Sequence, residues 1–290
     1  MEITTYPNPR FAFFGTPEIA ATALTEMETF GFVPALVVCN PDAPVGRKQV
    51  ITPPPSKVWA TERNITVFQP ATLKNADDLT PLTAEQFDFF VVFAYGKIIP
   101  QWLINLPKYG TINAHPSLLP KLRGASPIRS TLLSDLSAAG VTIMQMDAEL
   151  DRGPILYQQP VMLPEPIPGN TLDRTMALIS GDLLVHVMLE LQKGALTPIP
   201  QDHTEATFCT KITKDMSELL LNPKALPTGE EAVAAYRKIC AFDGWPETFF
   251  IHDGKRIKIK QASLAPTGEL VITRIVPEGK NEIDWSQYFN

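Results

Sequence analysis

Short apolar runs alternate with segments of helical spacing through the first half of the chain, and this alternation restricts the fold more than any other feature. The runs cover residues 11–14, 33–39, 66–68, 87–93, 109–113 and 141–146. Those at 33–39 and 87–93 have no regular polar face, which is typical of strands buried on both sides of a parallel sheet. Strands joined through helices require right-handed crossovers. We therefore predict an α/β fold with a doubly wound, Rossmann-like, mostly parallel sheet.

The segments between these runs predict helices and one long loop. Thr16-Pro17-Glu18 has the pattern of a helix start, with Thr as N-cap, Pro at the first helical position and Glu in the first turn. Helices are predicted over 19–30, 57–63 and 172–192. Residues 40–56 lack periodicity and are rich in Pro and charge, so a long surface loop is predicted there.

The C-terminal part of the chain predicts a second, smaller unit. Residues 193–214 contain few apolar side chains before Phe208. A helix over 230–242 and strands over 249–251, 255–262 and 270–275 are predicted beyond them. Asp253-Gly254 marks a hairpin turn. We expect a domain at 1–193, a linker at 194–227 and a small β-rich domain at 228–290.

Composition excludes several classes of protein. No apolar run approaches the roughly 18 residues of a membrane span, and the first residues lack the pattern of a signal peptide. Three widely spaced cysteines (Cys39, Cys209 and Cys240) predict neither a disulfide framework nor a zinc site, which fits a reducing cytoplasm. The net charge of −6 argues against a general nucleic-acid coat protein.

Polar residues follow several of the predicted strands. Asn113 and His115 end one strand, and Asp151 comes shortly after another. The segments at 15–16, 94–96 and Asn40 also follow strands. Because ligands bind beyond the carboxyl ends of the strands in such sheets, we expect these segments, Asp151 included, to meet at one edge.

The residue types at this edge fit the transfer of an acyl or formyl group to an amine. Asn113 can donate a hydrogen bond to an oxyanion and is neutral at every working pH. His115 can act as a base or as a donor, and Asp151 can hold the imidazolium or relay a proton. No Ser or Cys nucleophile is required, because the amine attacks directly. We predict Asn113, His115 and Asp151 as the catalytic residues.

Each of these residues also has a structural interpretation. A single Asn at a strand end or an Asp-Arg-Gly sequence is most often a turn, and a single loop His is most often structural. His186 lies on an apolar helical face and is expected in a core or an interface, while His203 and His252 have no partner at ligand spacing. Neither a dinucleotide fingerprint nor a phosphate loop is present. It is the joint placement of the three that favours catalysis.

The residues around this trio resemble the folate-dependent formyltransferases. The resemblance rests on Asn113-Ala114-His115, SLLP at 117–120, RGA at 123–125, PI at 127–128, GVTIMQMD at 140–147 and Leu150-Asp151. Further matches at 14–17, 40–47, 67–70, 94–96, 237–242 and 245–246 extend it over nearly the whole chain.

This resemblance implies the substrates. The donor would be 10-formyltetrahydrofolate, with no metal, and the acceptor the α-amino group of methionine on initiator tRNA. The chain would then be a cytoplasmic, monomeric enzyme of one-carbon metabolism and translation initiation, without a membrane partner. The folate site would be lined by Phe93, Ala94, Tyr95, Gly96, Ser117, Leu118, Leu119 and Pro120.

The tRNA would contact the loop at Arg47 and Lys48 and the C-terminal domain. In that domain Arg256, Lys258 and Lys260 alternate with isoleucines, so a strand would carry the three charges on one face. The alternative for this basic strand is an ordinary solvated surface. The domain is expected to be OB-like but shortened relative to the family.

Two other functions fit parts of the pattern. An amino-sugar nucleotide acceptor would keep the chemistry, and the shortened C-terminal domain favours it, whereas Arg47 and Trp245-Pro246 count against it. A non-catalytic protein that binds folate or tRNA is the third possibility, and the complete trio counts against that.

Overall fold

The computed structural model describes residues 7–46 and 48–289, and the chain forms two compact units. The first contains the described residues up to Ala125, Gly140–Val161 and Arg174–Phe208. The second contains Ser126–Ala139, Met162–Asp173 and the chain from Cys209 onward. The division at 193 and 227 stays a prediction about which parts of the chain act as separate functional domains.

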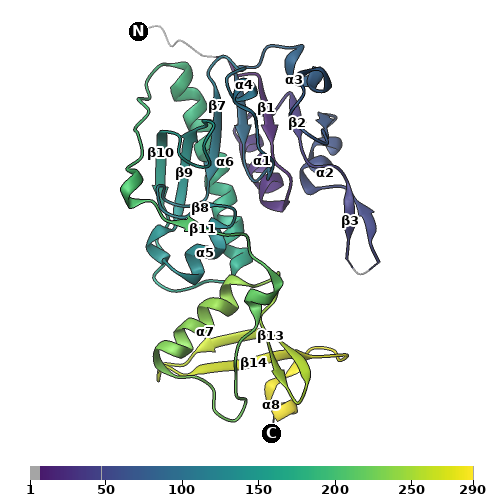
Figure 1. Ribbon diagram of the computed structural model, residues 1–290, viewed down its shortest axis with the longest axis vertical. Coiled ribbons are helices and arrows are strands. Elements are labelled where there is room, and N and C mark those ends of the chain that lie inside the picture. The colour runs from purple at the N-terminus through teal and green to yellow at the C-terminus, as the bar shows by residue number, and fades with distance from the viewer. Residues whose placement is uncertain (1–6, 47, 290) are drawn as a thin grey trace. The chain divides into compact units, whose positions relative to one another are not determined.

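A seven-stranded sheet forms the centre of the first unit (Figure 1). Its strands are β1 (Phe11–Phe14), β2 (Leu36–Val38), β5 (Thr66–Phe68), β6 (Phe89–Val92), β7 (Thr111–His115), β9 (Gly140–Gln145) and β10 (Ile155–Pro160). The order is β10-β9-β7-β6-β1-β2-β5. The five strands from β7 to β5 are parallel, while β9 and β10 are antiparallel to their neighbours. The predicted mostly parallel α/β fold is confirmed.

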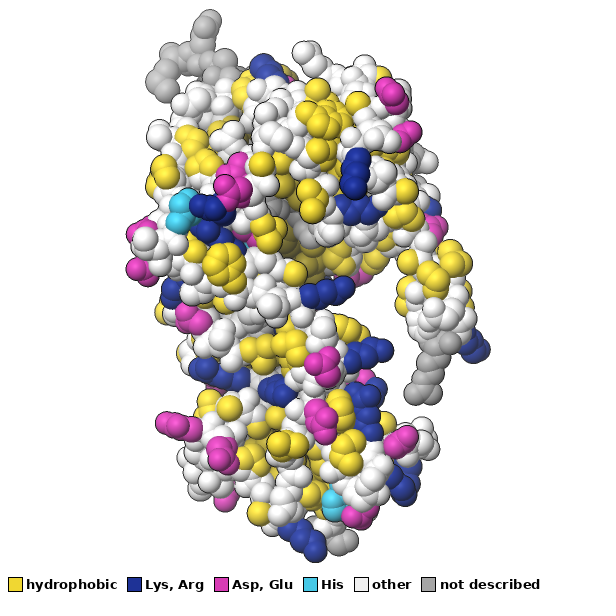
Figure 2. Space-filling view, viewed as in Figure 1, with side chains coloured by type: hydrophobic (Ala, Val, Ile, Leu, Met, Phe, Trp, Pro, Cys, Tyr) yellow, Lys and Arg dark blue, Asp and Glu magenta, His cyan; other side chains and the backbone are white. Residues whose placement is uncertain are grey.

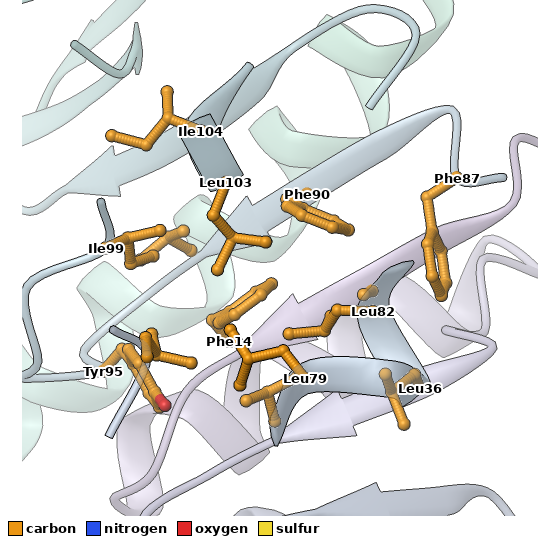
Figure 3. Close-up of a cluster of buried hydrophobic side chains, with 14 residues drawn as sticks. Phe14, Leu36, Leu79, Leu82, Phe87, Phe90, Tyr95, Ile99, Leu103 and Ile104 are labelled. Atoms are coloured by element: carbon orange, nitrogen blue, oxygen red, sulfur yellow. The ribbon is translucent and has the colours of Figure 1, made fainter. Parts of the chain in front are cut away.

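Both faces of the central strands are buried, as the apolar runs predict. On one face Phe14 and Phe90 pack with Leu82 and Leu103 in a cluster of buried side chains (Figure 3). The alternate residues of the same strands, such as Phe13 of β1, are equally buried. They point to the opposite face because side chains alternate along a strand. The helices of this unit are α1 (Glu18–Thr29), α2 (Pro55–Glu62), α3 (Thr80–Thr83), α4 (Gln101–Ile104) and most of α6 (Gly169–Gln192).

By length and composition, helix α6 is long and apolar enough to cross a membrane, contrary to the expectation from the sequence. Half of its apolar stretch is buried inside the fold. Its buried residues include Leu172, Met176, Leu184 and Met188, spaced as on one face of a core helix. Core helices of globular proteins can have the same length and apolar composition, so these two properties are weak evidence for a membrane span.

Two local predictions are wrong. Thr16 does not cap α1: the helix follows Pro17 without a side-chain cap, and the Thr16 hydroxyl accepts from the Asn40 backbone N–H. The expected loop at 40–56 contains a hairpin, β3 (Ala43–Val45) and β4 (Val50–Thr52), and the start of α2. Both hairpin strands are exposed, so they lack the burial pattern that reveals a strand in sequence. Hydrophobic side chains gather on this projecting arm (Figure 2).

A four-stranded antiparallel sheet forms most of the second unit. Its strands are β12 (Phe249–His252), β13 (Lys255–Leu264), β14 (Leu270–Pro277) and β15 (Ile283–Asp284). The helices of this unit are α5 (Pro127–Leu133), α7 (Gly229–Ala241) and α8 (Trp285–Phe289). Ile257 and Ile259 of β13 face a core with Ala235 of α7 and Phe250 of β12. The three predicted strands and the turn at Asp253-Gly254 are present, whereas β15 and α8 were not predicted.

Candidate active site

Strand β7 presents two of the predicted catalytic residues on one face. Asn113 and His115 are two positions apart, and side chains two apart on a strand point the same way. Asn113 pairs with Val92 of β6 on one side and with Met144 of β9 on the other. The end of β7 is therefore fixed between two buried strands, and it places Asn113 and His115 in a defined orientation.

The His115 ring is buried and held in one orientation. It is 4% exposed, and its Nε2 lies 3.0 Å from the Leu122 carbonyl oxygen. A carbonyl can only accept, so Nε2 carries a proton and donates to it. A neutral ring then has its lone pair at Nδ1. The free nitrogen of the ring is therefore the one that faces Asp151.

Asp151 reaches this nitrogen from a strained backbone. Its Oδ1 lies 3.6 Å from His115 Nδ1, and its Oδ2 accepts from the Gly124 N–H at 2.8 Å. The backbone φ of Asp151 is +53°, a conformation that side-chain-bearing residues rarely adopt. At 3.6 Å the two groups make an ion-pair contact when the ring is protonated, and it is longer than a hydrogen bond. The structure thus brings the predicted His and Asp together.

The route by which Asp151 arrives differs from the prediction. Strand β9 is antiparallel to β7, so its end at Gln145 pairs with Ile112 rather than lying level with the end of β7. The chain continues beyond β9, and the Asp151 carboxylate still lies 3.6 Å from His115, at the end of β7.

Asn113 contrasts with the other two residues because its side chain is unengaged. It is half-buried, and within the described chain no hydrogen bond involves its amide. Its position between buried strands still fixes where the amide lies. A positioned but unpaired amide can donate to an oxygen of a bound substrate, as an oxyanion requires.

The turn after β6 has a left-handed backbone at two residues. Ala94 and Gly96 have φ of +54° and +79°. The side chain of Tyr95 is 3% exposed and lies in the core beside Phe14, where Figure 3 shows it. Burial raises the pKa of its phenol. Of the four residues predicted to line the folate site here, Phe93 and Tyr95 are buried, Ala94 is half-buried and Gly96 is exposed.

Gly15 allows the neighbouring turn to approach. A Cβ there would lie 2.6 Å from the Phe93 carbonyl oxygen and 2.8 Å from the Ala20 side chain. The Thr16 N–H donates to the Ala94 carbonyl at 3.2 Å, which ties the ends of β1 and β6 together. Any side chain at residue 15 would separate these two segments.

The segment 117–120 is mostly internal. The Ser117 hydroxyl is buried and donates to the Lys121 carbonyl at 2.6 Å. The Leu119 N–H donates to the Thr142 hydroxyl at 3.0 Å. Leu118 and Pro120 are half-buried and the other two are buried. Only Leu118 and Pro120 are therefore accessible enough to contact a ligand. The folate-lining role of the segment stays a prediction.

The residues predicted to contact tRNA are in the β3–β4 hairpin and on β13. Arg47 is outside the described residues, and Lys48 is exposed in the β3–β4 turn. On β13 the charges and isoleucines alternate as predicted, but Lys258 and Lys260 both donate to Glu247. Arg256 lies over the Phe249 ring, 3.6 Å from its centroid. The basic strand is therefore partly neutralised by Glu247.

The structure places two other histidines outside the trio. His186 is exposed and so is not a core residue, and it contacts the Tyr157 ring edge-on. The Nδ1 of His203 accepts from Arg123 at 2.9 Å. The sequence also gave no sign of Gln201, which binds both Arg123 and the backbone of Asp151. These partners are 50 to 80 residues apart, so no local pattern predicts them.

Known proteins are similar to this chain in sequence. The formyl transferase family matches residues 9–182. Methionyl-tRNA formyltransferase of Caldicellulosiruptor saccharolyticus is 37% identical over 260 residues, covering 89% of this chain and 81% of that protein. The enzyme of the same name from Stutzerimonas stutzeri is 38% identical over 88% of this chain and 79% of its own length.

Solved structures share the fold. An N-formyltransferase from Helicobacter canadensis, in complex with folinic acid and dTDP-3-aminofucose, has a TM-score of 0.66 at 15% identity and covers 92% of this chain and 100% of that one. A 4-N formyltransferase from Francisella tularensis has a TM-score of 0.64 at 20% identity over 86% of this chain and 95% of that one. At such identities the likeness concerns the fold alone. With the family match and the curated relatives, the chain belongs to the formyltransferase family.

Replacing Asp151 by Asn tests the site. The amide oxygen can still accept from the Gly124 N–H, but the negative charge facing His115 is lost. We expect kcat to fall by about 10²- to 10⁴-fold, the usual contribution of a positioned acid or base, with little change in stability. The measurement is the steady-state rate of formyl transfer, with Glu149→Gln, an exposed residue of the same turn, as the control. An Asp151→Asn variant with a rate within twofold of the native protein would remove Asp151 from the mechanism.

Proposed function

We propose that this protein transfers the formyl group of 10-formyltetrahydrofolate to the α-amino group of methionyl-initiator tRNA, in translation initiation. The observation that carries the acceptor assignment is identity of 37% to a curated methionyl-tRNA formyltransferase across 89% of this chain. The acceptor is a charged tRNA used in translation initiation, so we propose the cytoplasm as the location of this protein.

The residues of the site suit a direct attack by the amine. The lone pair of the amine nitrogen forms a bond to the formyl carbon, and the carbonyl electrons move onto its oxygen. The unengaged Asn113 amide can donate to that oxygen. When the oxyanion collapses, the bond between the formyl carbon and the folate nitrogen breaks, and a proton passes from the amine to the departing nitrogen.

His115 and Asp151 are placed to manage this proton. Because Nε2 is committed to the Leu122 carbonyl, the exchangeable position of the ring is Nδ1, opposite Asp151 Oδ1. A proton held between these two atoms turns a repulsive contact of lone pairs into an attractive one. We propose that the pair takes up or releases one proton as the amine nitrogen loses its own.

The folate would lie against the main chain of 93–96 and beside Leu118 and Pro120. Gly96 supports this, because a Cβ there would have no atom within 4 Å, so the turn is open on that side. In this arrangement the protein would select the ring system by backbone hydrogen bonds and apolar contact, as is usual for small-molecule sites.

The acceptor assay tests the proposal. The purified protein is given 10-formyltetrahydrofolate with methionyl-initiator tRNA, and separately with a dTDP-linked amino sugar. We expect formylated methionyl-tRNA and no formylated sugar at equal protein concentration. Preference for the sugar would assign the acceptor named for the Helicobacter canadensis structure. Binding of folate or tRNA without turnover on either amine would instead favour the non-catalytic alternative.

The basic strand predicts a specific response to salt. Burial alone would raise the pKa of Glu247, but hydrogen bonds from Lys258 and Lys260 lower it, so the carboxylate is charged and neutralises one of them. Replacing Glu247 by Gln should free one positive charge for a phosphate. We expect the plot of log affinity for tRNA against log salt to steepen by about one unit.

The control for this change is Glu269→Gln, which alters net charge equally at an exposed position. If both variants shift the slope by the same amount, the effect is one of overall charge. In that case Lys258 and Lys260 return to the interpretation as a solvated surface.

A further inference from the structure

We propose that Gln201 is a positioning residue for the reaction: its amide clamps the backbone of the turn that carries Asp151, and buried Arg123 fixes the orientation of that amide. The inference rests on the proposed role of Asp151. It adds a residue from a segment that the sequence predicts as a linker.

The Gln201 amide uses both of its N–H donors on this turn. Nε2 donates to the Asp151 carbonyl at 2.9 Å and to the Gly153 carbonyl at 2.7 Å. A side-chain amide has two donors, so the nitrogen is fully engaged. The residue is 6% exposed, which leaves little room for water to replace these bonds.

Arg123 determines which way the amide points. Its Nε and one terminal nitrogen lie 3.2 and 2.6 Å from Gln201 Oε1. A guanidinium can only donate, and the oxygen is the only acceptor of the Gln201 amide, so the nitrogen of Gln201 must face the turn. Arg123 is 2% exposed, and burial lowers its pKa, yet a guanidinium stays charged in proteins. His203 Nδ1 accepts a further bond from it at 2.9 Å.

The turn needs such a clamp because its backbone is strained. A left-handed φ at a residue with a side chain persists only where its surroundings impose it. The turn is held on two other sides. Gly153 lies so close to β9 that a Cβ would be 1.9 Å from the Gln145 carbonyl oxygen, and the Asp151 carboxylate accepts from Gly124.

Without the amide, the strained peptide could relax and carry the carboxylate with it. The contact between Asp151 Oδ1 and His115 Nδ1 is already 3.6 Å, so a small shift removes it. A misplacement of about 1 Å can lower a catalytic rate by 10²-fold. Gln201 therefore acts on the rate through Asp151, without contact between its own side chain and His115.

Gln201→Glu keeps the contact with Arg123 and removes the hydrogen bonds to the turn. One carboxylate oxygen still accepts from Arg123, so the buried guanidinium keeps its partner. The other oxygen replaces the nitrogen and cannot donate to the carbonyls of Asp151 and Gly153. We expect kcat to fall at least tenfold, with KM for methionyl-tRNA and for 10-formyltetrahydrofolate within about twofold. Gln101→Glu, the same change at an exposed position of α4, should leave all three values unchanged.

Gln201→Asn provides a second variant that adds no charge. Its shorter amide cannot reach Arg123 and both carbonyls together, so the same selective loss of kcat is expected. Circular dichroism at the assay temperature shows whether each variant is folded. A residue with a structural role alone would lower the melting temperature without changing the kcat of the folded protein.

The outcomes distinguish this inference from the proposed function. If Asp151→Asn retains full activity, the proposed site is wrong. If Asp151→Asn is impaired while folded Gln201→Glu or Gln201→Asn has the native kcat, the site stands and the positioning role of Gln201 is overturned. A loss of kcat in both Gln201 variants at unchanged KM supports it.

Discussion

The 3.6 Å contact between His115 and Asp151 is the interaction on which the rest of the site depends. It joins the end of a parallel strand to a turn that follows an antiparallel one. Each partner is held from its far side, His115 by the Leu122 carbonyl and Asp151 by the Gly124 N–H. The pair is thereby arranged so that one proton between two defined atoms changes repulsion into attraction. Asn113 has no hydrogen-bond partner among the described residues, and in the proposed mechanism it is the neutral donor to the oxyanion.

Burial on both faces of the sheet is what makes this placement possible. Apolar side chains above and below fix β6 and β7, and the register between them sets the level of Asn113. The close approach at Gly15 then brings the ends of β1 and β6 together. The strands that carry this edge are therefore part of the core.

Much of the fold could be predicted because burial leaves a periodic mark in the sequence. The double-sided runs at β2 and β6 and the alternation along β13 are examples. The hairpin β3–β4 could not be predicted in this way, since Val45, Val50 and Ile51 are exposed and show no burial pattern. The direction of β9 was also beyond the sequence. An apolar run has the same burial pattern in a parallel and in an antiparallel strand. The direction of the strand depends on the path of the connecting segment.

Residue chemistry and spacing predict Asn113, His115 and Asp151 as catalytic residues, and the structure brings His115 and Asp151 together. The hydrogen bonds that hold these residues in place could not be predicted. Their supports were missed because hydrogen bonds between distant segments have no periodicity: Gln201 lies in a segment with few apolar residues, and its partner Asp151 is 50 residues away. Arg123 was recognised only as part of a family pattern, although its burial at 2% exposure shows a structural role for its charge.

A double-mutant cycle on His115 and Asp151 tests the central claim most directly. Formyl transfer to methionyl-tRNA is measured for His115→Ala, Asp151→Ala and the double variant. Residues that act as one unit give strongly non-additive effects. The account predicts that the double variant is no slower than the slower single variant. Multiplication of the two single effects in the double variant would show that His115 and Asp151 act independently, and would contradict the account.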